Sequence, residues 1–339
     1  MIWNKIKITN DKGEIVSVQS PVIISASRAT DIPAFYSDWF INRLKKGYLR
    51  WKNPFNGLPS YVSFHDTRLI VFWSKNPRPL LKHLNYLDEK GLNYYFQFTL
   101  NDYDAERLEP NVTPLQNRID TFIELSETIG KEKVVWRFDP LILTNDIRVD
   151  DLLRKVENIG NQLKNHTRKM VFSFADIKTY KNVQNNLIKN KINYTEFDEN
   201  LMNEFVSGLQ QLNKKWNFGI GTCAEETDFS KYNIIHNKCI DDDLIISQFA
   251  KDKELMNFLG VKIIPPSIFN PYPTIEKKRN NKDNGQRKLC GCIVSKDIGE
   301  YNTCPHQCEY CYANTSKEVA LKNYAQYKYN TNTETIKGE

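Results

Sequence analysis

Residues 21–27, PVIISAS, form a short apolar run that is followed by polar residues and then by the Ile32–Pro33 step. Apolar runs of about four to eight residues bounded by turn signals are typical of buried β-strands. Residues 34–46 then carry apolar side chains at helical spacing, and Gly47 follows them as a helix-ending residue. The stretch therefore predicts a strand, a charged loop and a helix, in that order.

The same order of strand and helix recurs along the chain, although the sequence itself does not repeat. Further strands are predicted at Leu69–Trp73, Tyr94–Leu100, Val134–Phe138, Met170–Phe174 and Phe218–Gly221. Helices are predicted at residues 80–90, 115–129, 149–163 and 198–214. Apolar strands that alternate with amphipathic helices favour a parallel sheet with right-handed crossovers. We therefore predict an α/β fold built as a partial, TIM-like (β/α)6 barrel.

An open doubly wound sheet is the alternative, but no G-x-G-x-x-G follows any predicted strand, which argues against dinucleotide binding. The barrel is favoured by polar residues just after the strands, because the carboxyl ends of barrel strands form one rim where enzymes hold their catalytic groups. The candidate cofactor-binding residues at this rim are Arg28, Asp31, Lys75, Arg137, Asp139 and Glu225.

These rim residues have structural as well as functional interpretations. Arg137 and Asp139 point to the same side of a strand, so they either pair with each other or bind a ligand. Arg28 and Asp31 have the same two interpretations. Lys75 either holds a carboxylate or phosphate as a point charge or is simply solvated.

The sequence pattern changes near residue 251. We expect residues 1–250 to form the partial barrel and residues 251–288 to be a polar linker and loop, with EKKRNNKDNGQRK at 276–288 flexible and solvated. Residues 289–330 would be a cysteine-rich, cluster-binding segment that packs on the barrel rim. A last helix is predicted near 317–327.

The composition of the 339 residues, 40% of them hydrophobic, is that of a globular protein. No run of about 18 apolar residues occurs, so we expect no membrane-spanning helix. The first residues lack the apolar core and cleavage site of a signal peptide, and we therefore expect a cytoplasmic protein with reduced cysteines. The net charge of +6 suits an anionic partner, but the charges are spread along the chain, so nucleic-acid binding has little support.

The stretch TCPHQCEYCYA, at residues 303–313, holds Cys304, Cys308 and Cys311 at C-x3-C-x2-C spacing, with Tyr310 before the last thiol. A four-iron four-sulfur (4Fe-4S) cluster takes one ligand per iron, so three thiolates leave one iron open. The alternative is zinc, since His306 would complete a Cys3His set.

This spacing, with its aromatic residue, resembles the signature of the radical S-adenosylmethionine (SAM) enzymes. The resemblance implies a barrel of radical SAM type in which the open iron binds SAM. It further implies that a reductant such as flavodoxin or ferredoxin supplies the electron that cleaves SAM to a 5'-deoxyadenosyl radical. In those enzymes the cysteines follow the first barrel strand, so here the loop must fold back over the rim, as in a permuted arrangement. The Gly-Gly-Glu segment that usually contacts the SAM amino group is absent.

Four cysteines lie outside this motif. Cys290 and Cys292 form Cys-Gly-Cys, while Cys223 and Cys239 lie after the last predicted strand. Four thiolates would complete a second site, either an auxiliary iron-sulfur cluster or a structural zinc. Core packing is the alternative for Cys223 and Cys239, because free cysteine is often buried as a small apolar side chain.

Several segments together resemble the bacterial family called domain of unknown function 1848. They are Ser27–Pro33, Phe72–Pro77, Arg137–Pro140, Cys223–Glu225, Cys239–Asp241, Cys290–Cys292 and Ser295–Ala313. The resemblance spans nearly the whole chain and implies a C-terminal iron-sulfur cluster, while the substrate stays unidentified.

Three functional hypotheses follow. The first is a radical SAM-like enzyme with a 4Fe-4S cluster and an unknown substrate. The second is a zinc-stabilised module that binds nucleic acid or protein. The third is a redox iron-sulfur protein that does not use SAM.

Overall fold

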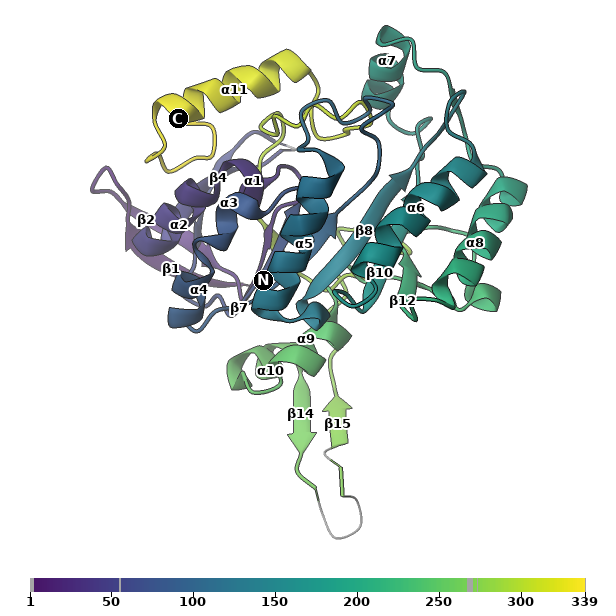
Figure 1. The fold of residues 1–339 in the computed structure, drawn as a ribbon. Helices are drawn as coiled ribbons and strands as arrows, with labels where there is room; N and C mark the ends of the chain where they lie inside the picture. Colours follow the sequence, from purple (N-terminus) through teal and green to yellow (C-terminus); the bar gives the residue numbers. More distant parts are fainter. Residues whose placement is uncertain (1–2, 55, 267–270, 273, 339) are drawn as a thin grey trace.

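Eight parallel strands form the central sheet, in the order β13-β12-β10-β8-β7-β6-β3-β16. The structure is a computed structural model that describes residues 3–54, 56–266, 271–272 and 274–338 (Figure 1). The strands are β3 (Ile23–Ala26), β6 (Leu69–Ser74), β7 (Asn93–Thr99), β8 (Val134–Leu141), β10 (Lys169–Phe174), β12 (Gly219–Thr222), β13 (Ile234–His236) and β16 (Lys296–Asp297). The predicted α/β class is confirmed, and all six predicted strands are present.

Helices connect these strands and cover one face of the sheet (Figure 1). They are α1 (Ile32–Phe35), α2 (Ser37–Lys46), α3 (Arg78–Leu81), α4 (Leu84–Glu89), α5 (Leu115–Ile129), α6 (Val149–Leu163), α7 (Lys181–Lys189) and α8 (Glu199–Asn213). Two single helices that the sequence predicted, over 34–46 and 80–90, are each broken into two. The Gly47 ending is confirmed, with this residue in the left-handed region at φ 85°.

Alternation along the strands divides the interior into two apolar clusters. Ile70, Phe96 and Trp136 belong to the large cluster that includes the helices. Their neighbours in sequence, such as Leu69 and Tyr95, belong to a smaller cluster on the opposite face of the sheet. Successive side chains of a strand point to opposite faces, so a sheet buried on both faces needs near-continuous apolar runs. These apolar runs are the pattern from which the strands were predicted.

The face of the sheet that carries the smaller cluster is called the inner face below. It is covered by two chain segments, 237–241 and 289–295. Ile293 N donates to Ile240 O at 3.1 Å, which joins the two segments. The side chains of Tyr95 and Gln97 each donate to Cys239 O at 2.7 Å, which fixes the first segment to the sheet. Among the described strands, the edges β13 and β16 pair with one neighbour each, so the sheet is open rather than a closed barrel.

Further strand elements lie outside the main sheet. A second sheet, in the order β1-β2-β5-β4, contains β1 (Asn4–Thr9), β2 (Ile15–Ser20), β4 (Tyr48–Lys52) and β5 (Pro59–Ser63). A short pair joins β9 (Leu143–Thr144) to β11 (Tyr194–Thr195). β14 (Val261–Ile264) and β15 (Thr274–Lys277) form an antiparallel pair. The prediction of a flexible loop over 276–288 was therefore wrong for residues 276 and 277, which belong to β15.

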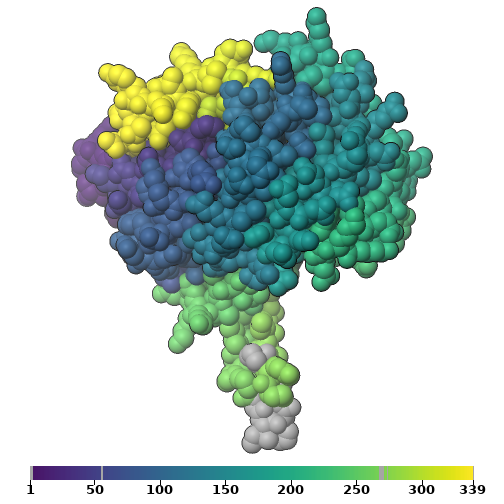
Figure 2. Space-filling model, viewed as in Figure 1, coloured from purple at the N-terminus to yellow at the C-terminus, as the bar shows by residue number. Residues whose placement is uncertain are grey.

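The C-terminal segment lies against the N-terminal part of the chain, at the opposite end of the molecule from the β14–β15 pair (Figure 1, Figure 2). Trp39 Nε1 donates to Thr333 O and Arg50 N to Glu334 O, both at 2.9 Å. The remaining helices are α9 (Asp242–Phe249), α10 (Lys253–Leu259) and α11 (Lys317–Tyr329), of which α11 corresponds to the helix predicted near 317–327. In the part of the chain that the structure describes, no helix is long and apolar enough to cross a membrane.

Replacing Trp136 with alanine should lower the free energy of unfolding by about 3–5 kcal/mol, because the side chain is fully buried and Nε1 donates to Leu100 O. Chemical denaturation followed by circular dichroism measures this loss. Tyr329→Ala is the control: its ring is 95% exposed, and its loss should change the stability by less than about 0.5 kcal/mol. Equal losses in the two variants would contradict the assignment of Trp136 to the core.

Candidate metal centre

The cysteine loop, residues 303–313, begins a short distance along the chain after β16 ends at Asp297. This strand pairs parallel with β3, so the loop lies beyond the carboxyl end of the sheet. Asp297 of β16 accepts hydrogen bonds from Ser25 Oγ at 3.0 Å, Ser27 Oγ at 2.6 Å and Arg28 N at 2.9 Å. The chain therefore folds back to β3, the first strand of the main sheet. The strand that precedes the loop was missed, because it has only two residues and both are charged.

The loop is fixed to the rim by hydrogen bonds that do not involve the thiols. Tyr36 Oη donates to Thr303 O at 2.5 Å. His306 Nε2 lies 2.8 Å from Asp31 Oδ2, and His306 Nδ1 lies 3.4 Å from Asn111 O. Both ring nitrogens of His306 thus have protein partners, and the imidazole is buried.

Cys308 is buried, while Cys304 and Cys311 are partly exposed. Burial raises the pKa of all three thiols above the ordinary value. Thiols in such surroundings ionise when a metal supplies the compensating positive charge. The donor set therefore fits a soft metal or an iron-sulfur cluster.

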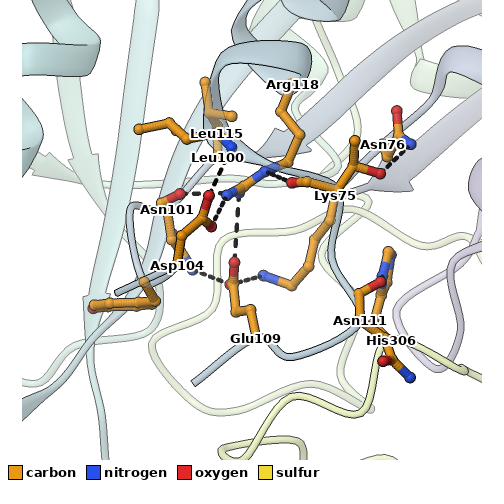
Figure 3. A network of polar contacts seen from close by, with 12 residues as sticks. Lys75, Asn76, Leu100, Asn101, Asp104, Glu109, Asn111, Leu115, Arg118 and His306 are labelled. Carbon is orange, nitrogen blue, oxygen red and sulfur yellow. Dashed lines mark hydrogen bonds and ion pairs between the residues drawn. The ribbon is translucent and has the colours of Figure 1, made fainter. Parts of the chain in front are cut away.

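A buried polar network lies next to the loop, and Figure 3 shows most of its members. Lys75 Nζ lies 2.7 Å from Glu109 Oε1 and donates to Tyr310 Oη at 2.8 Å. Tyr310 Oη also donates to Glu109, and Asn101 Nδ2 donates to both of these residues at 3.0 Å. Arg118 Nη1 lies 3.4 Å from Glu109 Oε2. Tyr310, the aromatic residue of the cysteine motif, is thereby anchored at the carboxyl ends of β6 and β7.

The charges of this network determine its protonation. Burial by itself would raise the pKa of Glu109, but Lys75 and Arg118 outweigh it and hold the pKa at about 2. The carboxylate therefore stays ionised and pairs with two cations in a buried site. A pair of this kind is costly to break, because the remaining charge stays buried without a partner.

Two of the predicted rim residues are therefore engaged within the protein. Asp31 accepts from Ser74 Oγ and Lys75 N, each at 2.7 Å, and from Ala34 N at 3.0 Å at the start of α1. Lys75 is neither solvated nor free, because it pairs with Glu109. Both residues position the cysteine loop. The sequence missed Glu109 and Arg118, since their spacing from Lys75 carries no recognisable signal.

The four remaining cysteines meet on the inner face of the sheet. Cys223 Sγ lies 3.5 Å from Cys239 Sγ. Cys239 N donates to Cys292 Sγ at 3.2 Å. Cys290, two residues before Cys292, has a buried side chain in the same apolar cluster. Hydrogen bonds from the two neighbouring thiols and the charge of Arg137 hold the pKa of Cys239 well below its ordinary value.

Arg137 and Asp139 form the ion pair that the sequence offered as one interpretation. Arg137 Nε donates to Asp139 Oδ2 at 3.1 Å, and Arg137 Nη1 donates to Cys239 Sγ at 3.0 Å. Asp139 accepts from Ser173 Oγ as well. Glu225 lies close by: it accepts from Phe174 N at 2.9 Å, and burial raises its pKa to about 7.

Arg28 differs from the other rim residues. Its guanidinium lies over the Trp73 ring, 5.2 Å from the centroid, and Arg137 packs on the same ring at 5.2 Å. Arg28 Nη2 and Trp73 Nε1 are buried and have no hydrogen-bond partner. Buried polar groups are nearly always hydrogen-bonded, so two neighbouring unpartnered donors indicate a place for a ligand acceptor.

Three consecutive carboxylates precede and begin α9. In the described ranges, the only three metal-ligating side chains whose ligand atoms all lie within 4.8 Å of one another are those of Asp241, Asp242 and Asp243. Lys169 pairs with Asp241, and Lys238 pairs with the other two. This acidic turn is neutralised by lysines and caps α9.

One protein-family model, described as "Domain of unknown function (DUF1848)", matches residues 23–313. The chain belongs to this family. The DUF1848 match contains the main sheet from β3 onward, both groups of cysteines and the rim residues. No curated protein and no solved structure matches the chain.

Glu109→Gln should lower the free energy of unfolding by about 3–5 kcal/mol, because it leaves Lys75 and Arg118 buried without their carboxylate. Glu124→Gln is the matched control: Glu124 pairs with Arg78 at 2.8 Å where both side chains are half exposed, and its loss should cost less than about 1 kcal/mol. Urea denaturation of both variants makes the comparison. Similar costs would show that the buried network does not anchor the loop.

The free energy of unfolding should also depend on pH through the carboxyl group of Glu109. Its pKa is about 2 in the folded protein against an ordinary value of 4.5, so its contribution is complete above pH 4.5 and is lost as the pH falls toward 2. This contribution amounts to about 3 kcal/mol. Urea denaturation at about pH 5 and about pH 3 should give a steeper loss for the native protein than for Glu109→Gln. Parallel losses in both proteins would assign the acid sensitivity to other groups.

Proposed function

We propose that the protein is an iron-sulfur enzyme of radical SAM type. Cys304, Cys308 and Cys311 hold a 4Fe-4S cluster with one open iron, and SAM binds to that iron. The substrate is unidentified, the reductant is a protein such as flavodoxin or ferredoxin, and the site of action is the cytoplasm, where thiols stay reduced.

The observation that carries the proposal is the position of the cysteine loop in the sheet. It follows β16, an edge strand that pairs parallel with β3, and it is followed by α11. In radical SAM enzymes the cysteines likewise follow the first strand of a partial barrel. A permuted chain, in which this first strand comes last, gives the order β16, β3, β6, β7, β8 and β10 across the sheet. The open eight-stranded sheet is thus compatible with a partial barrel of radical SAM type.

Two observations favour the cluster over zinc. Zinc with bonds of about 2.3 Å to its thiolates would require sulfur atoms about 3.8 Å apart. Within the described residues, the three thiols of the loop do not approach to within 4.8 Å of one another as a group. His306, the fourth ligand of a zinc site, already has partners on both nitrogens. A four-iron cluster binds each thiolate through a different iron and needs no histidine.

When bound, the cluster and SAM supply the radical chemistry, and the protein supplies placement and shielding. The pairs Asp31–His306 and Lys75–Glu109 fix the cysteine loop at the rim. Arg28 offers a buried, unpartnered Nη2 beside the loop, since Tyr312 Oη donates to Arg28 O at 3.2 Å. We assign Arg28 to an anionic group of SAM or of the substrate.

Protein purified without oxygen should convert SAM to 5'-deoxyadenosine when dithionite is added, and Cys308→Ser should abolish this conversion. Product is measured by liquid chromatography. Val319→Ala, which shortens an exposed side chain on α11, is the control and should retain the conversion. An iron-loaded protein that leaves SAM intact would support a redox iron-sulfur protein, and a zinc-loaded colourless protein would support a binding module.

A further inference from the structure

We propose that Cys223, Cys239, Cys290 and Cys292 bind a second 4Fe-4S cluster, in which the protein supplies a thiolate to every iron. This centre lies on the inner face of the sheet, whereas the cysteine loop lies beyond its carboxyl end. It does not depend on the radical SAM proposal, because the two groups of cysteines share no residue.

The four thiols come from three separate places in the chain. Cys223 follows β12, Cys239 follows β13, and Cys290 and Cys292 belong to the segment that returns along the inner face to β16. The sulfur atoms of Cys223 and Cys239 are 3.5 Å apart, and Cys292 Sγ accepts from the backbone N of Cys239 at 3.2 Å and of Ile240 at 3.4 Å. The fold thus gathers every cysteine outside the loop into one site.

Gly291 explains the Cys-Gly-Cys spacing. A Cβ at this position would lie 2.9 Å from Lys238 Cγ, which is closer than ordinary contacts allow. The absence of a Cβ lets the returning segment lie against Lys238 without displacing its side chain. Gly291 thus suits the close approach of this segment to the chain beside Cys239.

The surroundings of the sulfurs suit thiolates with negative charge. Cys239 Sγ accepts from Arg137 Nη1 at 3.0 Å and from Asn237 Nδ2 at 3.2 Å. Arg28, whose Nη2 is buried without a partner, adds a second guanidinium near the group. N–H donors to sulfur and nearby positive charge stabilise iron-sulfur clusters and tune their potentials.

These contacts also argue against simple packing. A free cysteine that packs as an apolar side chain needs no donors. Here the sulfurs of Cys239 and Cys292 accept from an arginine, an amide side chain and two backbone N–H groups, inside an apolar cluster. Arg137 already has Asp139 as its carboxylate partner, so its further contact with Cys239 Sγ is an additional interaction with the sulfur.

The thiols do not form a complete zinc site as they stand, although Cys223 Sγ and Cys239 Sγ lie 3.5 Å apart, near the spacing that zinc requires. In the described part of the chain, no three of the four sulfur atoms lie within 4.8 Å of one another. A single zinc would need all four about 3.8 Å apart. A cubane takes each thiolate on a different iron, so it accepts a wider set, and binding would separate Cys223 from Cys239.

A centre with four protein thiolates has no open iron and therefore does not bind SAM. It can accept and release one electron. Arg137 connects it to the rim, because the same guanidinium that donates to Cys239 also pairs with Asp139. We assign the second cluster to electron storage or transfer beside the rim.

Metal analysis of two double variants tests this inference. After anaerobic reconstitution, the native protein should hold about eight irons and eight sulfides per chain, and Cys304→Ser/Cys308→Ser should keep about four of each. Cys239→Ser/Cys292→Ser should also keep about four irons. We call Cys304→Ser/Cys308→Ser the loop variant and Cys239→Ser/Cys292→Ser the inner variant. The loop variant leaves the apolar core around Cys239 unchanged, so its result stands even if the inner variant folds poorly.

A second readout distinguishes the two centres. The electron paramagnetic resonance signal of the reduced loop variant should not change when SAM is added, whereas that of the inner variant should. A loop variant without iron, or with about one zinc per chain in place of the second set of irons, would overturn the inference. Conversely, about four irons that only the inner substitutions remove would keep the second cluster and refute the radical SAM proposal.

Discussion

The pairing of β16 with β3 is the contact on which the arrangement of the candidate site depends. It is only two residues long, and Asp297 strengthens it by accepting hydrogen bonds from the hydroxyls of Ser25 and Ser27. Gly299 lies so close to β3 that a Cβ would be 2.0 Å from Ser27 Oγ. Through this contact the last part of the chain joins the edge of a sheet that the first part builds. The same return of the chain positions the cysteine loop and brings Cys292 to the backbone of Cys239.

Buried charge is the second constraint on the site. Lys75, Glu109 and Arg118 lie in a region of low polarity, where each charge is stable only beside its partners. The aromatic residue of the cysteine motif, Tyr310, is hydrogen-bonded into this network. On the inner face Arg137 has the corresponding role, because it contacts both Asp139 and Cys239. The first network holds the cysteine loop through Tyr310, whereas the inner network includes the sulfur of Cys239 itself.

The sequence predicted what depends on continuous patterns. Apolar runs such as residues 69–73 and amphipathic stretches such as 149–163 identified the strands and helices of the main sheet, and the cysteine spacing identified the loop. It failed where the pattern is short or where tertiary contacts decide. β16 consists of two charged residues, and Glu109 lies in a loop that is separated from its partner Lys75 by 34 positions in the sequence. Asp31 follows a strand, and the sequence left open whether it pairs within the protein or binds a ligand; its partners within the protein, among them Ser74, Lys75 and His306, depend on tertiary contacts.

In the proposed enzyme, Cys304, Cys308 and Cys311 hold iron at the carboxyl end of the sheet. The most direct test is a crystal structure of protein prepared without oxygen, with anomalous diffraction recorded at the iron and zinc absorption edges. We predict an iron signal in contact with these three sulfurs and with no fourth protein ligand. A zinc signal at the loop, or an iron signal confined to the inner cysteines, would contradict the claim.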